Sequence, residues 1–265
     1  MEIVHRIGGN WSQADRDHFL RLGVVVPLDG RNKDQDVLGT LRRIGAFEIA
    51  ESDPRWPAVE EWIRGRQFVD IVAARFSPEE VAEAKWLVLS SSHHGYPCPD
   101  DYAAVTYSEL CETCGWRGRQ IAPFRMRGEP RWARRGLMQL NWVHDEVFAK
   151  PEVWKRFFEP RGVECLPVLD AKGHALKTVV QLVSQGEFGV DAKAQDTCLA
   201  CGASRYVFPV RGRFSRLREE PSGELVRTSQ FFGSGFRPIL VSQRLGRELL
   251  DNEIRDAFLA PVEGA

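Results

Sequence analysis

The chain has 265 residues, of which 43% are hydrophobic and 28% charged, and its formal net charge is −1. This composition is typical of a globular protein and excludes a uniformly basic chain that binds nucleic acid along its whole length. The N-terminal stretch does not join a basic start to an apolar core, and no apolar run approaches the roughly 18 residues of a membrane span. We therefore expect a cytoplasmic protein, in which cysteine thiols stay reduced.

Residues 1–89 contain no cysteine and predict a mixed α/β region. The apolar patterns of Gly23–Leu28 and Phe68–Phe76 predict strands. Asp34–Gly45 and Asp53–Gly65 predict short helices that end at glycine. The serine–proline pair that follows, with a glutamate at the third helical position, predicts the start of another helix.

A loop rich in serine, glycine and proline, Ser90–Tyr102, separates this region from the rest of the chain. Clusters of these residues interrupt helices and strands. We place the domain boundary at the start of the loop, so that residues 1–89 form one domain and residues 90–265 the other.

The second domain repeats itself: Cys111–Gly115 reads CETCG, and Cys198–Gly202 reads CLACG. Each motif is followed by a proline–arginine segment, a strand, a helix and a short closing strand. This order predicts an α+β fold in which two β-rich halves, each with one helix, are related by a pseudo-two-fold axis. The halves span about residues 105–183 and 190–265. Their strand, helix start and closing strand are Leu137–Val143, Pro151 and Leu166–Val168, and then Arg237–Val241, Ser242 and Ala260–Val262.

The two CxxCG motifs indicate a metal site. In a reducing compartment this spacing favours metal or redox chemistry over disulfides. The glycine after the second cysteine permits the positive φ of a zinc knuckle, and neither motif lies in the strand–helix setting of a thioredoxin-like centre. We predict one structural zinc ion bound by Cys111, Cys114, Cys198 and Cys201, in a closed site that leaves no coordination position for catalysis.

The alternative is two zinc ions, each completed by local ligands. His93, His94 or Cys98 would complete the first site, and Cys165 or His174 would complete the second.

Seven arginines and two acidic residues lie between Cys111 and Arg135, so this stretch is basic although the chain is nearly neutral. Interleaved aromatic residues make it suitable for an acidic protein partner or a nucleic acid. Its alternation also fits the solvated face of a strand. The candidate contact residues are Trp116, Arg117, Arg119, Arg125, Arg127 and Trp132.

His93 and His94, with Asp100 and Asp101, are the residues in this chain that could form a hydrolytic site. Adjacent side chains point in different directions, and the chain has no zinc-protease, nucleophile-elbow or phosphate-loop motif. We therefore expect a non-enzymatic protein and keep a hydrolase as the less favoured alternative.

Two CxxCG motifs, each heading a half that ends in a strand–helix–strand unit, resemble the double-CXXCG motif proteins. That family is best represented by paralogous myxobacterial proteins and includes immunity proteins of swarming-inhibition toxins. The resemblance covers residues 90–265 and departs from the family pattern at Glu112 and Leu199, where the family has proline. Arg237–Val262 also resembles the C-terminal unit of several immunity-protein families.

The resemblance implies a non-enzymatic protein that binds and blocks a cognate toxin, with the four cysteines as zinc ligands. The alternative function is a nucleic-acid-binding zinc-ribbon protein.

Overall fold

The computed structural model describes residues 1–35, 41–95, 106–108, 110–116, 118–141, 143–233, 235–254 and 256–264, and side chains outside residues 28–44. Two compact units divide the chain between Ser77 and Pro78, except that residues 210–212 group with the first unit. The boundary predicted from the sequence lay at residue 90. The chain enters the second unit earlier because β5 (Trp86–Ser90) is buried inside a sheet of that unit.

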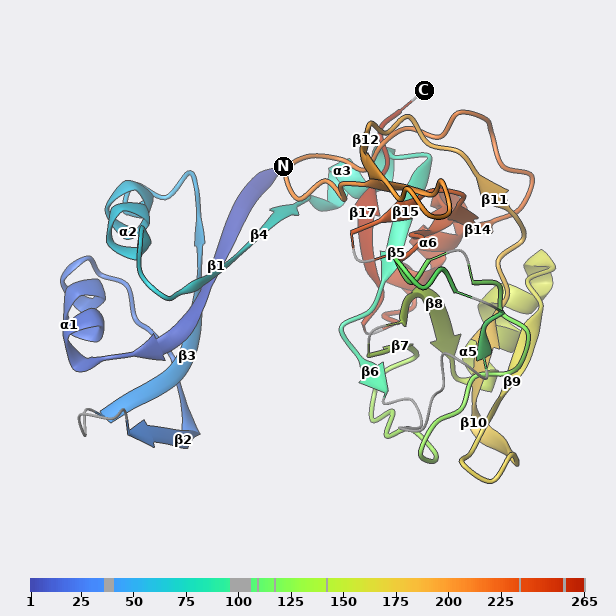
Figure 1. Ribbon diagram of the computed structural model, residues 1–265, viewed down its shortest axis with the longest axis horizontal. Helices are drawn as coiled ribbons and strands as arrows, with labels where there is room; N and C mark the ends of the chain where they lie inside the picture. The colour runs from blue at the N-terminus through green and yellow to red at the C-terminus, as the bar shows by residue number, and fades with distance from the viewer. Residues whose placement is uncertain are drawn as a thin grey trace. The chain divides into compact units, whose positions relative to one another are not determined.

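The first unit is a four-stranded antiparallel sheet, in the order β2-β3-β1-β4, with two helices on one face (Figure 1). Strand alternation places Ile7 and Trp11 on the helix-covered face, where they pack with Phe19 and Trp56. The elements are β1 (Glu2–Trp11), α1 (Gln13–Arg21), β2 (Leu28–Gln35), β3 (Leu41–Ala50), α2 (Trp56–Ile63) and β4 (Val69–Arg75).

Two of the four elements predicted for this unit are confirmed. α2 and β4 lie within the ranges predicted for a helix and a strand. The helix predicted for Asp34–Gly45 is wrong, because residues 41–45 belong to β3, which pairs with β1, while residues 36–40 lie outside the described chain. The strand predicted from Gly23 is also wrong. Gly23, at φ 74°, ends α1 with the paired hydrogen bonds of a Schellman motif.

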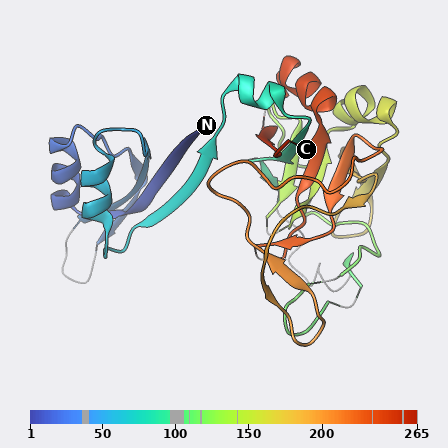
Figure 2. The same cartoon turned by 90° about the horizontal axis from the view of Figure 1, so that it is seen from above.

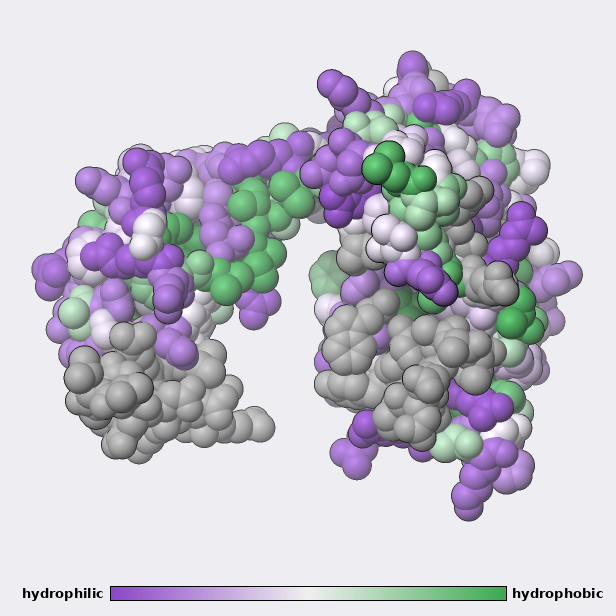
Figure 3. Space-filling view, in the orientation of Figure 1, coloured by the Kyte–Doolittle hydropathy of each residue, from purple (hydrophilic) through white to green (hydrophobic). Residues whose placement is uncertain are grey.

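The face of this sheet opposite the helices carries exposed apolar side chains on β4. Val69 is 60% exposed and Ile71 is 56% exposed, and Figure 3 shows a hydrophobic area over β1 and β4. Among the described strands, β4 pairs only with β1. It is therefore an edge strand with an apolar outer face, a combination that many proteins cover or interrupt with charge.

The second unit contains two five-stranded sheets with the same arrangement. Their orders are β6-β7-β8-β10-β9 and β11-β14-β16-β5-β17. In each sheet the first two strands are parallel and the later neighbours are antiparallel. A third, smaller sheet has the order β12-β13-β15. Besides β5, the strands are β6 (His94–Gly95), β7 (Leu137–Leu140), β8 (Val143–Ala149), β9 (Cys165–Leu169), β10 (Ala175–Leu182), β11 (Glu187–Phe188), β12 (Ala194–Thr197), β13 (Ser204–Tyr206), β14 (Leu225–Thr228), β15 (Phe231–Phe232), β16 (Ile239–Ser242) and β17 (Phe258–Pro261).

The two large sheets also share their register. In the second sheet, β5 takes the place that β10 takes in the first. Each of these strands then leads through a short connection into the outermost strand of the other sheet, β6 or β11. Equivalent rows across the sheets contain Leu137, Ala149, Val180 and Pro167 in the first, and Leu225, Val241, Leu87 and Pro261 in the second.

One helix follows β8 and another follows β16. The two helices lie side by side on one side of the unit (Figure 2). Phe158 from one and Leu249 from the other share a core with Leu87 and Leu137. The Ser242 hydroxyl caps the second helix by accepting a hydrogen bond from the Leu245 N–H. The helical elements are α3 (Pro78–Glu83), α5 (Pro151–Val153) with its π-helical continuation η1 (Trp154–Phe158) and 3-10 turn η2 (Glu159–Arg161), and α6 (Gln243–Asp251).

These elements agree with the predicted order of the second domain. The predicted strand Leu137–Val143 divides between β7 and β8, and the two closing strands correspond to β9 and β17. The fold is therefore α+β and rich in strands. Within the described ranges, no helix has the length and apolarity that a bilayer crossing requires.

Candidate metal centre

Each CxxCG motif folds into a tight turn closed on its first cysteine. The Gly115 N–H donates to the Cys111 carbonyl at 2.7 Å, and the Gly202 N–H donates to the Cys198 carbonyl at 2.8 Å. Gly115 has φ 73° and Gly202 has φ 72°. Glycine adopts this left-handed region at least cost, so the positive φ expected after each second cysteine is confirmed.

The two turns bring four sulfur atoms together. The Cys111 and Cys198 Sγ atoms are 3.9 Å apart, the Cys114 and Cys201 Sγ atoms are 3.6 Å apart, and all four lie within 4.8 Å of one another. A tetrahedral ion with metal–sulfur bonds of about 2.3 Å requires sulfur separations of about 3.8 Å. A disulfide requires about 2.05 Å. The cysteines are therefore free thiols that lie close enough together to hold one metal ion.

The thiols of the first turn differ in acidity. Backbone N–H groups of Cys114 and Thr113 point at the Cys111 sulfur and lower the pKa of this thiol to about 6. Removal from water, together with the neighbouring thiols, raises the pKa of Cys114 to about 12. Four thiolates repel one another, so full ionisation of the cluster requires a cation between them.

Among the described residues, no histidine, carboxylate or further cysteine joins this cluster. Cys165 lies in β9, and His174 lies in an exposed turn with its Nδ1 3.3 Å from an Asp170 oxygen. Cys98 is outside the described residues. The geometry therefore favours one shared site over two separate sites completed by these ligands.

The basic stretch after the first turn does not line one continuous surface. Arg119 lines a cavity of about 620 Å³, whereas Arg127 lines another of about 430 Å³. Arg125 is half-buried, and its backbone bridges to Leu169. Arg117 is outside the described residues. The arginines are thus distributed over at least two separate regions.

Of the two predicted contact tryptophans, one belongs to the core. Trp132 is 7% exposed, and its Nε1 donates to the Thr178 carbonyl at 2.8 Å, so its prediction as a contact residue is corrected. It packs with Phe124 and Met138 because alternation turns the apolar side of this stretch inward. Trp116 is half-buried and stacks on Phe231 with ring centroids 6.2 Å apart.

The larger cavity contains a buried ion pair that was not predicted from the sequence. Arg227 Nη1 donates to Glu146 Oε1 at 2.8 Å, and Gln181 Nε2 donates to Glu146 Oε2 at 2.9 Å. Burial raises the pKa of Glu146, while the Arg227 charge opposes that rise. A glutamate followed by three apolar residues in a buried strand was a local signal for such a pair, although it did not identify the partner.

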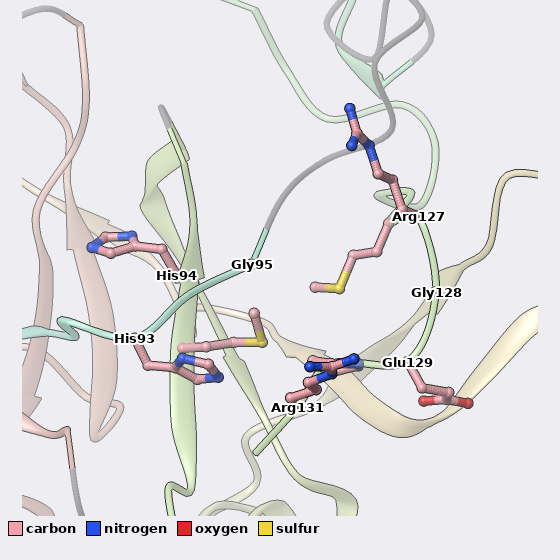
Figure 4. Close-up of a pocket in the computed structure, with 10 residues that line it drawn as sticks. His93, His94, Gly95, Arg127, Gly128, Glu129 and Arg131 are labelled. Atoms are coloured by element: carbon pink, nitrogen blue, oxygen red, sulfur yellow. The ribbon is translucent and has the colours of Figure 1, made fainter. Parts of the chain in front are cut away.

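His93 and His94 line the smaller cavity, and their rings point in different directions, as expected (Figure 4). Arg135 Nη1 donates to His93 Nδ1 at 3.2 Å. No described carboxylate hydrogen-bonds to either ring, and Asp100 and Asp101 are outside the described residues. The convergent pair that a hydrolytic site requires is not formed by the described residues.

Comparisons of the chain with protein-family models, with curated proteins and with solved structures give no match.

Proposed function

We propose that the second unit is a duplicated module whose copies are linked by one structural zinc ion. The common strand order and register of the two large sheets support a duplication. The cysteines that approach one another are equivalent members of the two motifs, and each pair is separated by 87 residues. A pseudo-two-fold axis between the motifs would bring such equivalent pairs together.

In this duplication each copy begins with a strand that pairs in the sheet of the other copy. β5 lies between β16 and β17, and β10 lies between β8 and β9. The copies are then residues 86–169 and 175–261 in place of the halves drawn from the motifs alone. This exchange is like that of a domain-swapped dimer, except that both copies belong to one chain.

Zinc is the metal that suits this site best. Four thiolates in tetrahedral arrangement select zinc or an iron–sulfur centre, and zinc brings no redox chemistry. Because the cysteines come from two distant turns, binding would stabilise the folded state directly. A four-cysteine site has no open position, so its role would be structural.

We infer that the protein is a non-enzymatic, cytoplasmic binding protein, and specifically an immunity protein that blocks a cognate toxin by steric occlusion. The observation that supports this most is the closed cysteine cluster joining two copies, which provides a rigid scaffold without a position for substrate. The resemblance to the double-CXXCG proteins supports the toxin as partner. Exposed arginines such as Arg119 and Arg127 would speed association with an acidic partner.

Metal content tests the zinc clamp. We expect about one zinc ion per chain in purified protein and well below one in Cys111→Ser, because three thiolates leave the tetrahedral site incomplete. Cys165→Ser is the matched control, since this free cysteine lies outside the cluster, and it should keep the zinc. Full zinc retention in Cys111→Ser would contradict the proposed site.

Rescue from toxicity tests the immunity function. If a toxin-like C-terminal domain is encoded beside this protein, the assay produces that domain with and without it. We expect growth and a co-eluting complex only when both are present. Toxicity that continues despite soluble protein would refute the proposal. If instead retention on heparin falls steeply between about 50 and 200 mM salt, the nucleic-acid-binding alternative gains support.

A further inference from the structure

The cavity beside His93 has a volume and lining typical of a small-molecule binding site (Figure 4). Its volume of about 430 Å³ lies within the range of roughly 300–1,000 Å³ that is usual for such pockets. Met126 and Met138 are both buried and provide apolar walls. Methionine is flexible and polarisable, so these walls can adapt to a hydrocarbon chain.

One polar group is held in position at this cavity. Arg135 donates to His93 Nδ1 at 3.2 Å, so the neutral ring carries its proton on Nε2. Arg135 is itself fixed by Asp256, with Nε 2.8 Å from a carboxylate oxygen. Burial and the Arg135 charge lower the pKa of His93, which keeps the ring neutral.

No acceptor in the described part of the chain meets the Nε2–H of His93. The residue is only 9% exposed, and Nε2 has no hydrogen-bond partner among the described residues. A buried donor without a partner costs free energy, and an acceptor brought by a ligand removes that cost.

The charge around the cavity is positive. Arg127 and Arg131 are exposed at its edge, and neither forms an ion pair within the described chain. The acidic residue of the lining, Glu129, points away from the histidines in Figure 4 and accepts hydrogen bonds from the Lys177 and Thr178 N–H groups. Among the described residues, the cavity therefore offers hydrogen-bond donors and cations to a ligand, but no free carboxylate.

We propose that this pocket binds a small carboxylic acid with an apolar body, of the size of octanoate. The hydrocarbon lies against Met126 and Met138, and the carboxylate accepts from His93 Nε2 and pairs with Arg127 and Arg131. A neutral alcohol of equal length keeps the apolar contacts and loses the charge-assisted hydrogen bonds, which are the stronger kind.

Isothermal titration calorimetry with octanoate and with 1-octanol tests this proposal. We expect the intact protein to prefer octanoate. His93→Phe should weaken octanoate binding by about tenfold or more, because it keeps the ring but removes the donor. His93→Gln keeps an amide N–H near the position of Nε2 and should retain most of the affinity.

Arginine variants keep the test informative if the buried His93→Phe fails to fold. The exposed pair Arg127→Gln and Arg131→Gln should together weaken octanoate roughly two- to fivefold, with no effect on 1-octanol. Arg119 lines the other cavity, so Arg119→Gln is the matched control and should leave the affinity for octanoate unchanged. Equal affinity for acid and alcohol, unchanged binding in the arginine pair, or no octanoate binding tighter than about 10 mM would overturn the proposal.

Discussion

Disruption of the ion pair between Glu146 and Arg227 should strongly lower the stability of the protein. The Glu146 side chain is 2% exposed and the Arg227 side chain 11%, and their closest charged atoms are 2.8 Å apart. Removal of one partner from a buried pair costs about 3–5 kcal/mol, because the other charge is left without compensation. We expect Arg227→Met to lower the free energy of unfolding of the second unit by this amount at neutral pH.

A second substitution distinguishes the free energy lost with the ion pair from the cost of the unpaired charge that the single variant leaves behind. If Glu146→Leu is added to Arg227→Met, neither charge of this pair remains, and replacement of a whole pair by apolar side chains is often nearly neutral. The double variant should therefore recover most of the stability that the single variant loses. This recovery should occur even though Gln181 and Ser184 lose hydrogen-bond partners.

The pH dependence of Arg227→Met has a defined sign. Burial already raises the pKa of Glu146, and loss of Arg227 removes the charge that opposes this rise. A carboxyl group whose folded pKa exceeds its unfolded pKa binds its proton more tightly in the folded state. Its stabilising effect is present below the unfolded pKa and is lost as pH rises through the folded pKa. The defect should thus be smaller near pH 5 than near pH 8.

Urea unfolding followed by fluorescence measures these effects in the full-length chain. With a slope of about 3 kcal/mol per molar urea, the loss corresponds to a midpoint lowered by about 1–1.7 M. A loss below about 1 kcal/mol, no recovery in the double variant, or a larger defect at low pH would refute this reasoning.

Two further substitutions and one metal-removal experiment follow from the structure. Gly202→Ala should lower the free energy of unfolding by about 1–2 kcal/mol and speed metal loss to a chelator, because residue 202 has φ 72°. Gly128→Ala is the control: this position has open space and no positive φ, so neither stability nor metal loss should change. Ser242→Ala removes the cap of α6 and should cost about 1 kcal/mol, measured as a lower melting temperature of the second unit. Chelation of the metal should lower that same melting temperature and leave the first unit unchanged, and an unchanged curve would contradict a structural metal.

Signals within a few residues were sufficient to predict the two CxxCG turns. The CxxCG spacing and the positive φ of its glycine depend only on local backbone geometry, so both motifs were recognisable in the sequence. The helices at Pro151 and Ser242 were predictable for the same reason, since proline and serine are characteristic of helix starts. Asp34–Gly45 shows the limit of such signals, because pairing of β3 with β1 overrode a helical pattern.

Local sequence signals predicted the cysteine turns, some of the strands and the helices at Pro151 and Ser242 of the second unit, and the similarity of the two motifs. Long-range packing decided that β5 lies between β16 and β17, that Trp132 is buried, and that Arg227 meets a glutamate 81 residues away. The physical reason is the range of the interactions. A turn is stabilised by neighbours in the chain, whereas strand pairing and the compensation of a buried charge depend on groups that only folding brings together.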